Sequence, residues 1–189
     1  GTFDWSDEKY IRMLIPQLEQ LVDFYVENDN LRLDQMMNRK LEMCEEKNRP
    51  IKKWCGIGTG AIFFDVDGTR RPCPFVTPMT FEPKELEEIC AHDYSKTEDF
   101  IDNHCFNDCY MYPVCPHCAG ANYLTQKTYK IRDKSKCKIQ KLITLYSADL
   151  QAKRIVKNPN KYDNATKYTL INAIKKVKDL YLEEFSDYL

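Results

Sequence analysis

Apolar residues recur three and four positions apart near the start of the chain, which is the spacing of a helix with one buried face. The first such run predicts a helix over residues 6–28, with Ser6 as its N-terminal cap. Pro16 lies inside this run and should kink the helix or mark a break. A second run predicts a helix over about 33–47, which Pro50 ends.

The same spacing returns in the last third of the chain. It predicts one helix from Lys138 to about Lys157 and a last helix from about Asn164. The sequence Asn158-Pro159-Asn160 should separate the two, because proline and asparagine favour turns. Both ends of the chain are therefore expected to be helical.

Between the helical ends the pattern changes to alternation. Residues 62–66 alternate apolar side chains with smaller or polar ones, and Asp67-Gly68 is a strong two-residue turn signal. We therefore expect a β-hairpin whose return strand carries Cys73. A short helix is predicted around 84–92, and residues 103–123 are expected to be irregular.

Composition narrows the class of protein. The chain has 189 residues, of which 43% are hydrophobic, and this is enough for a modest core. Its formal net charge of −1 gives no general attraction to nucleic acid. No stretch approaches the roughly 20 apolar residues of a membrane span, and the opening residues do not resemble a signal peptide. We therefore expect a cytoplasmic protein that binds neither nucleic acid nor membrane.

Charge is unevenly distributed along the chain. Residues 127–161 hold eleven Lys or Arg against two acids, whereas residues 82–108 hold nine acids against two lysines. One interpretation is a pair of solvated faces that attract each other. The other is a basic groove that binds an acidic peptide.

The chain has nine cysteines, and seven of them follow a spaced register. In a reducing compartment, clustered cysteines bind metal more often than they form disulfides, and an odd count fits disulfide pairing poorly. The central four read C-x3-C-x5-C-x2-C. The seven are Cys55, Cys73, Cys105, Cys109, Cys115, Cys118 and Cys137.

Two kinds of metal site suit these thiolates. A structural zinc site needs four ligands, and the central four cysteines could form one, which would leave the other three unexplained. Iron–sulfur clusters are also held by four thiolates each, so seven thiolates nearly fill two clusters. The eighth ligand could be Cys90, Cys44, a histidine or a group outside the chain. His104 and His117 are expected to form hydrogen bonds near the cluster, or simply to be exposed, rather than to coordinate.

The order of these residues resembles the SPASM domain of radical S-adenosylmethionine enzymes. That domain has a first Cys, then Gly-x4-Cys, a block of four cysteines and a last Cys. This chain has Cys55, then Gly68-x4-Cys73, the central block and Cys137. The usual block reads C-x2-C-x5-C-x3-C, so the chain keeps the central spacing and exchanges the outer two. The resemblance covers residues 50–145.

The resemblance implies two auxiliary [4Fe–4S] clusters. Our candidate for the fourth ligand of cluster I is Cys90, and the alternative is an open iron that binds substrate. Gly68 would form the turn before Cys73. The other implied ligands are Cys55, Cys73 and Cys118 for cluster I, and Cys105, Cys109, Cys115 and Cys137 for cluster II.

The resemblance also implies a partner. The C-x3-C-x2-C motif, whose cluster cleaves S-adenosylmethionine, does not occur in this sequence. We therefore expect the C-terminal portion of a longer enzyme, whose radical S-adenosylmethionine barrel lies in the same polypeptide. This portion alone would not be catalytically competent. It would transfer electrons and position a peptide or protein substrate.

The predicted fold class is α+β, with a small hairpin and cysteine-rich loops organised around two iron–sulfur clusters and flanked by amphipathic helices. We expect a helical linker over residues 1–50, the auxiliary-cluster domain over 51–145 and a helical extension over 146–189. The alternatives are a zinc-stapled interaction module and a stand-alone ferredoxin-like electron carrier.

Overall fold

The computed structural model describes residues 5, 7–45 and 55–189, and these form parts of two compact units. We call the first the helical unit and the second the cysteine-rich unit. The helical unit comprises Gly1–Arg49, Tyr110–Cys115 and Lys134–Leu189, and the cysteine-rich unit comprises Pro50–Cys109 and Pro116–Asp133. The boundary predicted at 145/146 falls inside a continuous helix, so the observed division differs from the expected one.

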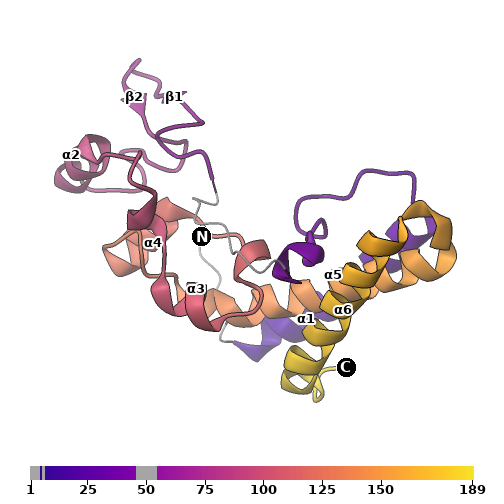
Figure 1. The fold of residues 1–189 in the computed structure, drawn as a ribbon. Coiled ribbons are helices and arrows are strands. Elements are labelled where there is room, and N and C mark those ends of the chain that lie inside the picture. Colours follow the sequence, from indigo (N-terminus) through magenta and orange to yellow (C-terminus); the bar gives the residue numbers. More distant parts are fainter. Residues whose placement is uncertain (1–4, 6, 46–54) are drawn as a thin grey trace. The chain divides into compact units, whose positions relative to one another are not determined.

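Three long helices dominate the described part of the helical unit (Figure 1). Helix α5 (Cys137–Lys157) packs against both α1 (Glu8–Glu27) and α6 (Asn164–Tyr181). Buried side chains lie on several sides of α5, as its central position requires. The helices predicted near the two ends of the chain are thus confirmed. Among the described residues, no helix has both the length and the apolar character to cross a bilayer.

Helix α1 begins at a cap different from the predicted one. The Asp7 side chain accepts a hydrogen bond from the backbone amide of Lys9 at 2.9 Å, which satisfies a donor of the first turn. The predicted cap, Ser6, lies outside the described residues. Pro16 lies inside the helix, which continues to Glu27, so the chain does not break at this proline, and the alternative of a kink stays a prediction.

The helix predicted over 33–47 is wrong for the part of that range that the structure describes. Turns and extended backbone come first, and a short 3₁₀ helix, η1 (Leu41–Glu45), follows. The Asp34 carboxylate accepts hydrogen bonds from the backbone amides of Met36 (2.6 Å) and Met37 (3.1 Å). Such local side-chain bonds favour a turn over a helix.

Polar side chains of α5 bond to the backbone of this non-helical segment. Ser147 Oγ donates to the carbonyl of Met37 at 2.9 Å, and Gln151 Nε2 donates to the carbonyl of Arg39 at 2.9 Å. The Arg39 guanidinium in turn donates to Gln140 Oε1 at 2.7 Å. These bonds from a distant helix take the place of the bonds within a helix, so the backbone stays satisfied without being helical.

The cysteine-rich unit contains a two-stranded antiparallel sheet. Strand β1 (Phe63–Phe64) pairs with β2 (Arg70–Arg71), and Gly68 adopts a φ of +78° in the turn between them, a conformation that glycine adopts readily. The predicted hairpin is confirmed. Its strands are shorter than expected, so Cys73 lies two residues beyond β2 instead of on it.

Short helices make up much of the rest of this unit. Helix α2 (Pro83–Ala91) confirms the helix predicted around 84–92. The expectation of irregular structure over 103–123 is wrong, because α3 (Asn103–Asp108) and α4 (Ala119–Gln126) cover much of that range. The remaining 3₁₀ helices of the described chain are η2 (Thr97–Phe100), η3 (Tyr112–Val114), η4 (Lys134–Lys136), η5 (Pro159–Lys161) and η6 (Glu183–Phe185).

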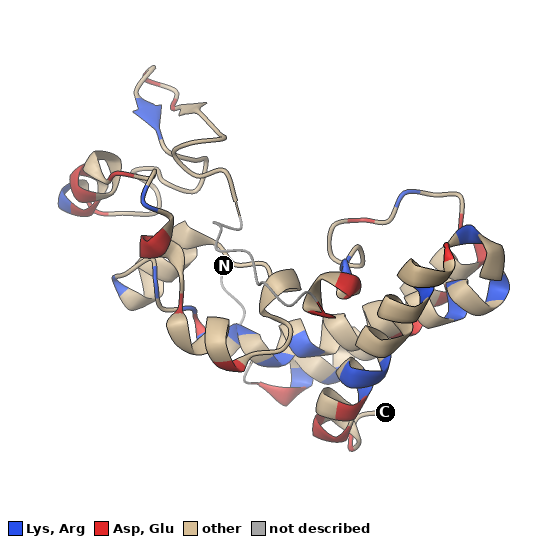
Figure 2. Ribbon diagram, viewed as in Figure 1, with Lys and Arg blue, Asp and Glu red and all other residues tan. Residues whose placement is uncertain are grey.

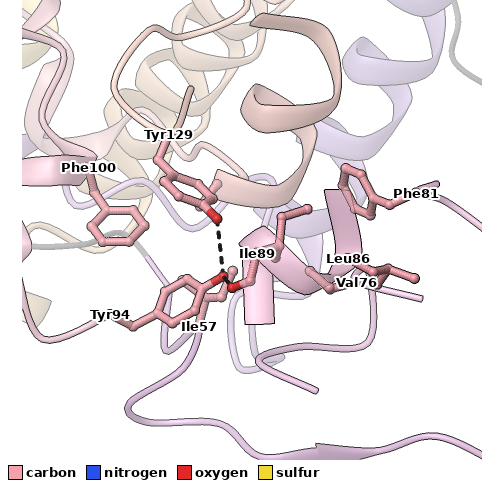
Figure 3. Close-up of a cluster of buried hydrophobic side chains, with 9 residues drawn as sticks. Ile57, Val76, Phe81, Leu86, Ile89, Tyr94, Phe100 and Tyr129 are labelled. Carbon is pink, nitrogen blue, oxygen red and sulfur yellow. Dashed lines mark hydrogen bonds between the residues drawn. The ribbon is translucent and has the colours of Figure 1, made fainter. Parts of the chain in front are cut away.

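An aromatic and aliphatic core holds the cysteine-rich unit together (Figure 3). The Tyr94 hydroxyl donates to the carbonyl of Ile89 at 2.8 Å and lies 3.4 Å from the Tyr129 hydroxyl. The side chain of Cys73 packs against this core. The buried members are Ile57, Val76, Phe81, Leu86, Ile89, Tyr94, Phe100, Ala119 and Tyr129.

Candidate metal centre

The three thiols predicted for cluster I belong to the same unit. Cys55 lies in the loop before β1, Cys73 follows β2, and Cys118 is the N-cap residue of α4. The three come from segments far apart in the sequence, so their proximity depends on contacts between those segments.

The first contact joins the Cys55 loop to the segment of Cys73. The backbone amide of Gly58 donates to the carbonyl of Pro72 at 3.0 Å. Gly58 has a φ of +67°, and a Cβ added to it would lie 2.3 Å from the Tyr94 ring. Only glycine therefore allows the loop to lie this close to the core.

The second contact joins α4 to the same segment. A Cβ added to Gly120 would lie 2.6 Å from the Phe75 ring. Gly120 is two residues after Cys118, and Phe75 is two residues after Cys73. The close packing of these neighbours brings the two cysteines into one region of the unit.

Cys55 and Cys118 lie near enough to Cys73 to affect its ionisation. Burial raises the pKa of the Cys73 thiol, and negative charge on Cys118 and Cys55 raises it further. The backbone amides of Phe75 and Val76 donate to the Cys73 sulfur and act in the opposite direction on this pKa. A bound cation would remove the repulsion between the thiolates, so the donor set suits a metal centre.

Cys90 lies at the edge of the same region. It occupies the last turn of α2, and Arg71 Nη1 donates a hydrogen bond to its sulfur at 3.7 Å. Burial raises the pKa of Tyr94 and of Tyr129, and charge on both Cys90 and Cys73 adds to each increase. The two cysteines therefore lie around the same pair of tyrosines.

The four cysteines predicted for cluster II belong to different units. Cys105 lies in α3 and Cys109 is its C-cap, with the Cys109 amide donating to the Cys105 carbonyl at 3.1 Å. Cys115 follows η3, and Cys137 is the first residue of α5, both in the helical unit. The structure places each pair within its own unit, and the set of four stays a prediction.

Asp102 is a buried residue of this region that the sequence interpretation missed. Its carboxylate accepts hydrogen bonds from the amides of His104 (3.1 Å), Cys105 (3.2 Å) and Arg132 (3.0 Å). Burial raises the pKa of Asp102, but these hydrogen bonds outweigh it and leave the pKa below its ordinary value. The carboxylate thus fixes the start of the helix that carries Cys105. An Asp directly before Asn103 is a recognisable capping signal.

The two histidines of the cysteine block differ in surroundings. Burial, followed by the nearby charge of Arg132, lowers the pKa of His117 to about 3, so the imidazole is neutral. Within the described residues, its buried Nδ1 has no hydrogen-bond partner. His104 is exposed, and its Nδ1 lies 2.8 Å from Asp108 Oδ2. The expectation that neither histidine coordinates metal stays a prediction.

All nine cysteines lie in the described ranges, and each is a thiol rather than half of a disulfide. In the same ranges, no group of three or more Cys, His, Asp or Glu side chains has the geometry to hold a metal ion as it stands. Cysteine has a single side-chain torsion, so rotation about χ1 moves its sulfur without moving the backbone. The backbone contacts at Gly58 and Gly120 would persist through such rotations.

Figure 2 colours the basic residues of α5 blue, and several of them bond to other residues of the helical unit. Lys141 Nζ lies 2.6 Å from Glu184, and Lys153 Nζ lies 3.1 Å from Asp149. Arg154 donates to the carbonyl of Tyr25 at 2.8 Å. These contacts do not favour a groove in which the same cations bind an acidic peptide.

Comparisons of the chain with family models, with curated proteins and with solved structures gave no match. A functional assignment therefore depends on the cysteine register and on the contacts that bring its members together.

Proposed function

We propose that this chain is the auxiliary iron–sulfur portion of a radical S-adenosylmethionine enzyme that modifies a peptide or protein. The observation that carries the proposal is that the segments of Cys55, Cys73 and Cys118 are held together by the close contacts at Gly58 and Gly120. The resemblance assigns these same three cysteines to one cluster.

The residues of the chain would do three things at this centre. The thiolates would hold the cluster, and the amides of Phe75 and Val76 would stabilise the thiolate of Cys73, because charge-assisted hydrogen bonds are the strong ones. The aromatic core would keep water from the side of the centre against which Cys73 packs. When bound, an iron–sulfur cluster supplies one-electron transfer.

Anaerobic reconstitution with iron and sulfide tests the proposal. Two cubane clusters require about eight irons per chain. Cys55→Ala and Cys73→Ala should each remove about four irons, because each removes a ligand of the same cluster. Cys44→Ala is the matched control, since Cys44 is buried in the helical unit and lies outside the register, and it should leave the iron content unchanged.

The alternatives give different results in the same experiment. A zinc-stapled module would hold one zinc and no iron, and Cys55→Ala or Cys73→Ala would leave the zinc content unchanged. A stand-alone electron carrier would bind iron without a C-x3-C-x2-C motif upstream in the same reading frame. Either result would refute the proposed function.

A further inference from the structure

Arg71 connects the hairpin to Cys90. Its Nη1 donates to the Cys90 sulfur at 3.7 Å, while its Nε lies 3.6 Å from Asp65 Oδ2. The side chains of Arg71 and Asp65 are only 13% and 14% exposed. One guanidinium therefore contacts a carboxylate and a thiol at the same time, with the ion pair largely covered from solvent and the Cys90 side exposed.

The position of Cys90 is fixed from two sides. Leu86 and Ile89 of α2 are buried in the core that also contains Val76, three residues after Cys73. Arg71 lies two residues before Cys73 and contacts the sulfur of Cys90. The segment of Cys73 thus touches α2 on both sides of that cysteine, which brings Cys90 toward it.

We propose that Cys90 is the fourth thiolate of the centre formed by Cys55, Cys73 and Cys118, and that Arg71 is the residue that positions it. This inference rests on the proposed function. It completes a set of ligands drawn from the cysteine-rich unit alone, with no open iron and no group from outside the chain.

The contacts of Arg71 also imply a redox effect. Hydrogen bonds to the sulfurs and nearby charge set the potential of an iron–sulfur cluster. A cationic donor at a ligand sulfur stabilises the reduced cluster, which carries one more negative charge, and so raises the reduction potential. Lysine cannot replace this residue, because only the planar guanidinium offers separate donors to Asp65 and Cys90.

The test compares arginines that are neighbours on one strand (Figure 2). Arg71→Gln should lower the midpoint potential of one cluster, so that its ratio of reduced to oxidised form falls about tenfold, which is 59 mV for a one-electron couple. Arg71→Lys should show most of this decrease. Arg70→Gln is the matched control, because Arg70 is exposed on the same strand, and it should leave the potential unchanged.

Two further variants, Asp65→Asn and Cys90→Ala, test the same inference if Arg71→Gln does not fold. Asp65→Asn leaves Arg71 in place but removes the carboxylate that partly neutralises it, so a smaller shift in the opposite direction, to a higher potential, is expected even if Arg71→Gln fails to fold. Cys90→Ala should change the paramagnetic resonance of that cluster in the reduced protein, or remove about four irons.

The outcomes separate this inference from the proposed function. Unchanged resonance in Cys90→Ala, together with equal potentials in Arg71→Gln and Arg70→Gln, would overturn the role of Cys90 and Arg71. The proposed function would survive that result if the unmodified protein held about eight irons. An unmodified protein that binds no iron would overturn both.

Discussion

Replacing Asp102 with alanine tests whether a buried carboxylate holds the start of α3. The Asp102 side chain accepts hydrogen bonds from the amides of His104 and Cys105 in the first turn of the helix. It also accepts one from the amide of Arg132, thirty residues along the chain. Alanine removes all three hydrogen bonds at once.

The expected loss follows from these bonds. Loss of an N-terminal cap costs about 1 kcal/mol. The Arg132 amide would also be left buried without this acceptor, which adds about 1–3 kcal/mol. Asp102→Ala should therefore lower the free energy of local unfolding by about 2–4 kcal/mol.

Asp163 provides the matched control. Its carboxylate caps α6 by accepting from the amides of Ala165 and Thr166, each at 3.0 Å, and from Thr166 Oγ1 at 2.6 Å, but it is exposed, and these partners in the described chain all lie within three positions of it. Asp163→Ala should therefore cost only about 1 kcal/mol. The difference of about 1–3 kcal/mol between the variants measures the buried bond to Arg132.

Native-state amide hydrogen exchange suits this comparison, because it reports the opening of each helix separately in a chain with two units. The amides of Cys105 and Phe106 report on α3, and those of α6 report on the control. Equal losses of protection in the two variants would refute the reasoning. The effect should also depend on pH: the pKa of Asp102 is lowered, so its contribution is present above the ordinary carboxyl pKa and disappears as pH falls through the lowered value.

Two further predictions concern the core of the cysteine-rich unit. Gly58 and Gly68 both have positive φ, so replacing either with alanine should cost about 1–2 kcal/mol of stability in backbone strain. Gly58→Ala should cost more than Gly68→Ala, because only at Gly58 would the added Cβ clash with Tyr94. Equal losses of stability in denaturant unfolding would contradict this. Burial raises the pKa of Tyr129 to about 12, so its contribution to stability is present below the unfolded-state pKa of about 10 and lost as pH rises from 10 to 12. Tyr129→Phe should therefore lose less stability than the unmodified protein over that range, and parallel curves would count against the assignment.

The long helices could be predicted from the sequence because each presents a continuous apolar face. Residues 33–47 also have apolar positions at helical spacing, yet the described part is a turn followed by a 3₁₀ helix. The decisive partner of Met37 is Ser147, which lies 110 residues further along the chain. Local spacing contains no information about such a bond, so tertiary structure overrides it.

The candidate metal ligands were predicted from the pattern of cysteines and not from the spacing of apolar residues. Spacing marked seven cysteines as candidate metal ligands, because metal sites require several thiolates to converge, and the resemblance to the SPASM domain assigned Cys55, Cys73 and Cys118 to one cluster. Spacing could not reveal the contacts that gather them, such as the one between Gly120 and Phe75, because these depend on packing between separate segments. Asp102 is a recognisable N-cap residue in the sequence, but no helix was predicted after it, because the segment between the cysteines was expected to be irregular.

The contacts that gather these segments belong to the chain itself. Each strand of the hairpin has only two residues, and such a hairpin is at best marginally stable alone. The bond from Gly58 to Pro72 and the hydrogen bond from Arg71 to the sulfur of Cys90 in α2 connect it to the rest of the unit, while the ion pair of Arg71 with Asp65 joins two parts of the hairpin itself. None of these contacts needs a metal. We therefore expect the core of the cysteine-rich unit to hold Cys73 in place before any cluster binds, unlike a zinc finger, in which the metal supplies the folding free energy.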